Sequence, residues 1–213
     1  MAIIALQSST QWDALAHVWY DDKLYNGFPA DSVTAGGASH CAISNMVEGI
    51  TGRAVLADVA RFKGVDILPE NYGITPEDLD ATLAAQQIKL FCGDILLVRT
   101  GCVGSWQRTG TGLGAHQPGL SFGCGAWLHR HEIAAVAADN MAVERLVPGP
   151  GEALMGLHMV ALRDMGLPFG ELFVLDELAA DCAQTAIYEM FLSAAPLYFP
   201  NAVGTPLNPL AIK

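Results

Sequence analysis

The feature that most constrains how this chain folds is its alternation of short aliphatic runs with helical segments. Three runs of strand length, 53-RAVLADVAR-61, 94-DILLVRTG-101 and 133-IAAVAAD-139, are aliphatic at their centres. Aliphatic runs of this length are typical of strands that are buried on both faces of a sheet. Because helical segments separate the runs, we predict an α/β fold in which a mixed β-sheet is flanked by helices.

The best-marked helix is predicted between the first two runs, over about 75–87. Thr75 is suited to the N-cap and Pro76 to the first helical position, and acidic residues follow in the first turn. Two further helices are predicted, one over about 121–131 with Ser121 as its cap, and one over 152–165 that ends at Gly166.

The segments between these elements are predicted to be irregular or short. Residues 21–40 and 102–119 are rich in glycine and polar residues, so both are predicted to be loops, the second a lid or substrate loop. Residues 171–178 are predicted to form a short strand or turn, followed by a helical turn and a long strand over 185–197. A chain of 213 residues has the size of one domain, so we assign 1–213 to a single domain.

Charge, hydropathy and cysteine content limit the partners, the cellular location and the oligomeric state that we expect for the chain. The chain carries 11 Lys+Arg against 22 Asp+Glu, so we expect neither a nucleic-acid partner nor an anionic membrane partner. It contains no apolar run near the ~20 residues that span a bilayer. Five cysteines without a C-x-x-C pair argue against a disulfide scaffold and favour a cytoplasmic location. With 52% hydrophobic and 15% charged residues, we predict a homodimer or higher homo-oligomer.

The segment 7-QSSTQWDALAH-17 concentrates polar side chains in an otherwise apolar chain. In an extended backbone Gln7, Gln11 and Asp13 point to the same side, because side chains alternate with a period of two. Two amide oxygens and a carboxylate on one face can bind a hard cation. The same three residues could equally form a hydrogen-bonded edge that faces solvent.

Three later residues are also candidates for ligand binding, although a structural role would explain them equally well. His158 lies on the apolar face of the helix predicted over 152–165, so its imidazole is predicted to point inward, as a ligand or as a core residue. Glu171 follows that helix and is a second candidate. Asp139 ends the third aliphatic run, where it can bind a ligand or cap the following turn.

Four aromatic residues could form the wall of a pocket for an aromatic substrate, or could simply pack in the core. They are Trp12, Trp19, Phe28 and Trp106.

The motifs of the chain resemble those of the cyclase family of metal-dependent hydrolases, which includes bacterial kynurenine formamidase and isatin hydrolase. Residues 7–17 are similar to the signature H-x-G-T-H-x-D-x-x-x-H, and the ending 195-APLYFPNAVGTPLNPLAI-212 is similar to the closing pattern of that family. The intervening matches are 52–61, 93–101, 118–128, 134–139 and 158–178. The resemblance covers nearly the whole chain and implies the cyclase-like, swivelling β/β/α fold.

The resemblance also implies roles for individual residues. Asp13 matches the metal-binding aspartate of the family and His17 its acid/base histidine, while His158 and Glu171 match the later residues that complete the metal site. Two differences stand out. Gln7 and Gln11 replace the two metal-binding histidines, and the strand that usually precedes the signature is largely missing, so we expect a shortened N-terminal segment.

The two glutamines affect the expected metal and activity. An amide oxygen is a weaker ligand for Zn²⁺ than a neutral imidazole, so Mn²⁺ is favoured, with Zn²⁺ or Mg²⁺ as alternatives. The resemblance implies a metal-dependent amidohydrolase that cleaves an amide or lactam-type C–N bond of a small, in some cases aromatic, substrate. Alternatives are a metal-free, non-catalytic relative that binds a small ligand or a partner, and a lyase or dehydratase that uses His17 as a base.

Overall fold

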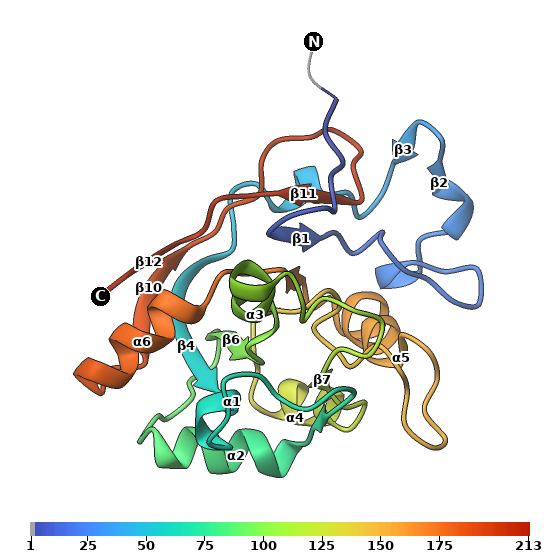
Figure 1. The fold of residues 1–213 in the computed structure, drawn as a ribbon. Helices are drawn as coiled ribbons and strands as arrows, with labels where there is room; N and C mark the ends of the chain where they lie inside the picture. Colours follow the sequence, from blue (N-terminus) through green and yellow to red (C-terminus); the bar gives the residue numbers. More distant parts are fainter. Residues whose placement is uncertain (1–2) are drawn as a thin grey trace.

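The computed structural model describes residues 3–213, and a mixed sheet of eight strands dominates it (Figure 1). The strands of this sheet are β1 (Gln11–Asp13), β4 (Thr51–Asp58), β6 (Ile95–Arg99), β8 (Ala135–Ala138), β9 (Phe169–Glu171), β10 (Glu189–Ser193), β11 (Gly204–Pro206) and β12 (Leu210–Ile212). Their order is β11-β1-β9-β8-β6-β4-β10-β12. The four central strands, β9, β8, β6 and β4, are parallel, and the strands on both sides of them pair antiparallel. The predicted mixed-sheet α/β fold is thereby confirmed.

Helices and short strands complete the fold. The helices are α1 (Val59–Phe62), α2 (Pro76–Ala85), α3 (Cys102–Thr109), α4 (Cys124–Arg130), α5 (Gly156–His158) and α6 (Asp176–Thr185), with a π-helix, η4 (Met159–Met165), that continues α5. Short 3₁₀ helices are η1 (Tyr25–Gly27), η2 (Ala30–Ser32) and η3 (Ile43–Met46). Two small sheets pair β2 (Val33–Thr34) with β3 (Gly37–Ala38), and β5 (Gly73–Ile74) with β7 (Gly119–Leu120).

The central strands are buried on both faces, as their aliphatic sequences predict. Along β4, Val55 and Ala57 belong to a core that includes residues of α1, α2 and α4. Ala54 and Leu56 alternate with them and belong to a second core with Trp12 and residues of α6 and β10. In Figure 1, α1, α2 and α4 group together at the lower edge of the view, apart from α6. Burial on both faces therefore requires helices on both sides of the sheet.

Two helix ends follow the sequence prediction. At the start of α2, the Thr75 hydroxyl accepts from the Asp78 backbone N–H, and the Asp78 carboxylate accepts from the Thr75 backbone N–H. This reciprocal pair is a capping box and satisfies two backbone donors. Gly166 ends η4 with a φ of 67°, the left-handed conformation predicted for it.

The prediction of a loop throughout 102–119 is wrong, because α3 occupies its first half. Glycines in and just before this segment serve the helix instead. Gly101 takes a φ of 90° as N-cap, and a Cβ at Gly104 would clash with the Asp176 carboxylate. Asp139 holds the start of this helix, since its carboxylate accepts from the backbone N–H groups of Thr100 and Gly101. Asp139 therefore caps a turn, although the turn is after β6 and not after β8.

Other element boundaries also differ from the prediction. The helix predicted from 152 begins at Gly156, and Leu154 is 63% exposed outside it. The predicted helical turn before the last long strand is the ten-residue helix α6, while that strand is only the five residues of β10. Within residues 3–213, no helix is long and apolar enough to cross a membrane.

Candidate active site

The pairing of β1 with β9 places the first candidate residues together. Gln11 lies directly opposite Glu171 in this antiparallel pair, and its Nε2 donates to Glu171 Oε2 at 2.5 Å. Asp13 is two residues further along β1 and is fully buried, like Gln11. Trp12, between them, points to the other side of the sheet and packs against Phe173 with ring centroids 5.3 Å apart. The two-residue period predicted for this segment thus holds for Gln11 and Asp13.

His158 reaches the same place from α5. Its Nε2 lies 3.4 Å from Glu171 Oε1 and 3.8 Å from Asp13 Oδ2, and its side chain is fully buried. Asp13, His158 and Glu171 each offer one ligand atom, and these three atoms lie within 4.8 Å of one another. That spacing leaves room for one shared cation among them.

Gln7 reaches these residues from a turn, and not from the extended strand predicted for it. It is an exposed residue in a turn before β1, and its side chain folds back so that Nε2 donates to Asp13 Oδ1 at 2.7 Å. The same nitrogen lies 3.0 Å from His17 Nδ1. His17 Nε2 is 4.0 Å from Asp13 Oδ2, and the His17 side chain is 25% exposed. His17 therefore lies on the solvent side of a buried group.

All six residues predicted from the sequence for this site lie together, and we call them the candidate cluster. They are Gln7, Gln11, Asp13, His17, His158 and Glu171.

Burial and charge shift the acid–base properties of the candidate cluster. Burial, together with the charge of Glu171, raises the pKa of Asp13 to about 6. Burial alone would lower the pKa of His158, but hydrogen bonds with Glu144 and Glu171 and the nearby carboxylates outweigh it and raise that pKa to about 9. Burial lowers the pKa of His17, and the charge of His158 adds to this. The charge of Asp13 acts in the opposite direction and raises the pKa of His17, but burial outweighs it.

Two buried oxygens show whether a metal ion suits this site. Among the residues that the structure describes, Gln11 Oε1 and Asp13 Oδ2 have no hydrogen-bond donor, although both are inaccessible to solvent. A buried acceptor without a partner is costly, and a cation would satisfy both. One imidazole nitrogen with carboxylate and amide oxygens is a donor set that oxygen-preferring divalent ions accept. The residues present therefore fit a divalent ion of that kind.

One residue of the site carries no sequence signal. Glu144 is more than nine-tenths buried, and its Oε1 lies 2.6 Å from His158 Nδ1. In the sequence, Glu144 is a single Glu in the turn region after β8. Its spacing from His158 is not one that a helix or strand would bring together. Its contact with His158 depends on how the 139–158 segment folds back, which no local pattern specifies.

Comparison with known proteins identifies the family. The chain matches the Cyclase family model over residues 2–145, which is more than half of its length. The chain belongs to the cyclase family. No match was found among curated proteins.

Solved structures agree with the family and with its fold. A structure described as a novel cyclase is 47% identical, with a TM-score of 0.90 over 99% of this chain and 71% of that one. An isatin hydrolase bound to the product analogue thioisatinate is 17% identical, with a TM-score of 0.67 over 98% of this chain and 72% of that one. A potential metal-dependent hydrolase with cyclase activity is also 17% identical, with a TM-score of 0.62 over 98% and 80% of the two chains. At 17% identity, these last two structures show only that the fold is shared.

The aromatic residues proposed as substrate contacts are dispersed within this cyclase fold. Trp12 is fully buried and its Nε1–H donates to Ala194 O, so it packs in the core and does not line an open pocket. Phe28 stacks on His40 with ring centroids 4.2 Å apart, and Trp19 is partly exposed. A substrate contact by Trp19, Phe28 or Trp106 stays a prediction.

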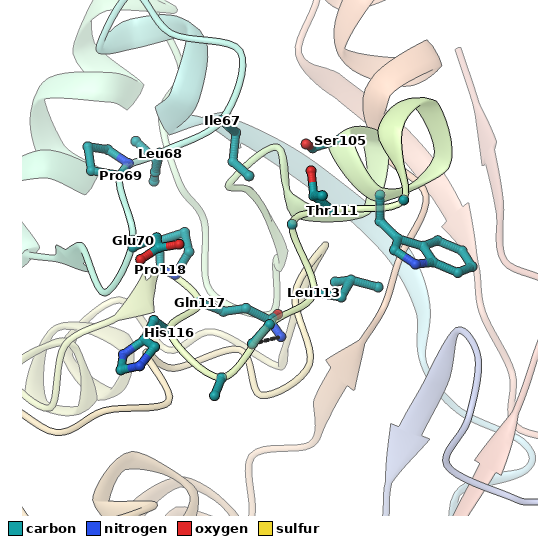
Figure 2. Close-up of a pocket in the computed structure, with 15 residues that line it drawn as sticks. Ile67, Leu68, Pro69, Glu70, Ser105, Thr111, Leu113, His116, Gln117 and Pro118 are labelled. Carbon is teal, nitrogen blue, oxygen red and sulfur yellow. Dashed lines mark hydrogen bonds between the residues drawn. The ribbon is translucent and has the colours of Figure 1, made fainter.

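A separate cavity is drawn in Figure 2. It has a volume of about 770 Å³ and is lined by residues 67–70, Ser105, Trp106 and 110–118, so no member of the candidate cluster lines it. Figure 2 shows His116 and Gln117 below Ser105 and Thr111 in the view. Trp106, which is half exposed, lines this cavity and not the candidate cluster.

Proposed function

We propose that the chain is a metal-dependent hydrolase that opens an amide or lactam-type C–N bond of a small molecule. The observation that carries this proposal is the meeting of Asp13, His158 and Glu171 around two buried oxygens that lack donors. Membership of the cyclase family supports it, as does the likeness of the fold to an isatin hydrolase and to a potential metal-dependent hydrolase.

The residues divide the chemistry between them. A divalent ion held by Asp13, His158 and Glu171, with Gln11 Oε1, would polarise the substrate carbonyl and favour ionisation of the attacking water. His17 is neutral at pH 7 because burial lowers its pKa, so it can accept a proton from that water. It then returns the proton to the departing nitrogen. The His17 side chain is 25% exposed, so proton transfer would occur on the solvent side of the buried metal ligands.

Metal content and metal preference test the proposal. Protein purified without chelator should contain a divalent ion, lose hydrolysis of a small amide or lactam after chelation, and regain it better with Mn²⁺ than with Zn²⁺. The matched comparison is the double variant Gln7→His/Gln11→His, which replaces the amides by imidazoles. This variant should shift the preference toward Zn²⁺. Full activity after chelation would contradict the proposal.

A metal-free role is favoured by a different observation. The His158 imidazole has a pKa of about 9 among carboxylates, so in its protonated form it supplies positive charge without a metal. The amide groups of Gln7 and Gln11 also donate to Asp13 and Glu171. If purified protein contains no metal and binds none, the chain is a non-catalytic relative that binds a small ligand or a partner.

We also propose a homodimer or higher homo-oligomer in the cytoplasm. On the outer pair of strands, Phe191 and Ile212 are direct cross-strand neighbours and both are more than half exposed. An exposed apolar pair beside an edge strand is a surface that association would cover. All five cysteines are free, as in a reducing compartment.

The oligomer is expected to sediment as a dimer or larger species at micromolar concentration. Replacing Phe191 with Glu should weaken this association by placing a charge in the covered surface, while Phe62→Glu, at another exposed position, should not. A clean monomer for the wild-type chain in sedimentation or light scattering would disprove it.

A further inference from the structure

Glu144 uses both of its carboxylate oxygens at the start of α5. Oε1 accepts from the backbone N–H of His158 at 2.8 Å, and Oε2 accepts from the backbone N–H of Leu157 at 3.1 Å. The same Oε1 lies 2.6 Å from the ring nitrogen Nδ1 of His158. One carboxylate therefore fixes both the backbone and the side chain of the same histidine.

This contact also fixes which ring nitrogen carries hydrogen. Both carboxylate oxygens of Glu144 already act as acceptors for backbone N–H groups, so Nδ1 of His158 is the donor in this contact. In the neutral ring the lone pair is then on Nε2, the nitrogen that faces Asp13 and Glu171. Phe169 packs against the ring nearly perpendicularly, at 85° with centroids 5.0 Å apart, and limits its rotation.

We infer that Glu144 is a positioning residue, which orients His158 so that Nε2 faces the carboxylates of Asp13 and Glu171. The inference rests on the proposed function where it concerns the metal ion, because an oriented Nε2 would be the ligand atom. Carboxylates that hold a histidine ligand in this way commonly change metal affinity 10–100-fold when they are removed, which is roughly the loss expected here.

Three substitutions and one control separate orientation from folding. Glu144→Leu removes the acceptor, Glu144→Asp keeps the charge but withdraws it from Nδ1, and Glu144→Gln keeps one acceptor oxygen of the same length. The control is Glu152→Gln. Glu152 also accepts a backbone N–H, from Gly149, and pairs with Arg145 in the segment before α5, but it does not contact His158.

The first readout is the Nδ1–H proton of His158 in nuclear magnetic resonance of ¹⁵N-labelled, metal-free protein, distinguished from Nε2–H by its couplings to the ring carbon-bound protons and assigned by its absence in His158→Gln. We expect a signal that exchanges slowly with water in the wild-type chain, in Glu144→Gln and in Glu152→Gln. The signal should be lost in Glu144→Leu and Glu144→Asp. The second readout is Mn²⁺ affinity by calorimetry, expected to fall by roughly 10–100-fold in Glu144→Leu, by less in Glu144→Gln, and not in Glu152→Gln.

A persistent Nδ1–H signal in Glu144→Leu would overturn the inference, and so would an equal loss of Mn²⁺ affinity in Glu152→Gln. If circular dichroism shows that Glu144→Leu is unfolded, Glu144→Asp decides by the same signal. If the wild-type chain binds none of Mn²⁺, Zn²⁺ and Mg²⁺, the proposed hydrolase function fails, but the Nδ1–H signal still decides whether Glu144 orients His158.

Discussion

Replacing His17 with Asn is expected to lower turnover of a hydrolysable amide by about 10²–10⁴-fold, the usual effect of losing an acid/base group. Metal content should stay nearly unchanged, because Asp13, His158 and Glu171 remain in place. His17 is well placed for this role, since it is a partly exposed neighbour of the buried ligands and its Nε2 lies 4.0 Å from Asp13 Oδ2. Steady-state kinetics together with metal analysis of the same preparation would measure both quantities.

The pH dependence gives a second measure of the same residue. A general base acts in its neutral form, so activity should rise as pH increases through the pKa of His17. Burial lowers this pKa, so the rise should lie below the usual range for histidine and activity should already be level at neutral pH. The matched control is His129→Asn, in the last turn of α4 and outside the candidate cluster. Full turnover in His17→Asn, or an equal loss in His129→Asn, would rule out this role.

The central sheet could be predicted from the sequence because its strands are buried on both faces. The runs at 54–57, 95–98 and 135–138 are continuous and aliphatic, a pattern that is typical of strands in a parallel sheet covered on both faces. The short outer strands β11 and β12 carry no such run, and their pairing depends on distant segments. Helix α3 was missed because Gly104, which packs closely against Asp176, cannot be told from a loop glycine by sequence alone.

The candidate cluster could be predicted in part for equally physical reasons. Gln11 and Asp13 share a strand face and His158 lies on the buried side of a helix, so local periodicity indicates all three. Gln7 reaches Asp13 from a turn, which periodicity does not describe. Glu144 is 14 residues from the histidine it contacts, and the fold of the intervening segment alone brings them together.

Replacing Asp13 with Ala is expected to remove both bound metal and hydrolysis, because Asp13 supplies a ligand oxygen and carries a buried charge. Asp13→Asn should separate these two properties. Burial raises the pKa of Asp13 from 3.8 to about 6, so its ionised form costs the metal-free fold about 3 kcal/mol above pH 6, a cost absent below pH 3.8. The neutral isostere avoids that cost. Metal-free Asp13→Asn should therefore unfold at pH 7 at a temperature no lower than the metal-free wild-type chain.

Thermal unfolding with chelator and with Mn²⁺ measures this difference directly. Binding to the folded state alone adds about 2.7 kcal/mol when the ion is at 100 times its dissociation constant, so the wild-type unfolding temperature should rise with Mn²⁺. Asp13→Asn should show no rise, while Asp31→Asn, at an exposed position outside the candidate cluster, should behave as wild type. A rise in Asp13→Asn equal to that of the wild type would mean that the ion binds elsewhere. A lower unfolding temperature for metal-free Asp13→Asn would mean that the charge of Asp13 stabilises the fold through its neighbours Gln7 and His158 even without metal.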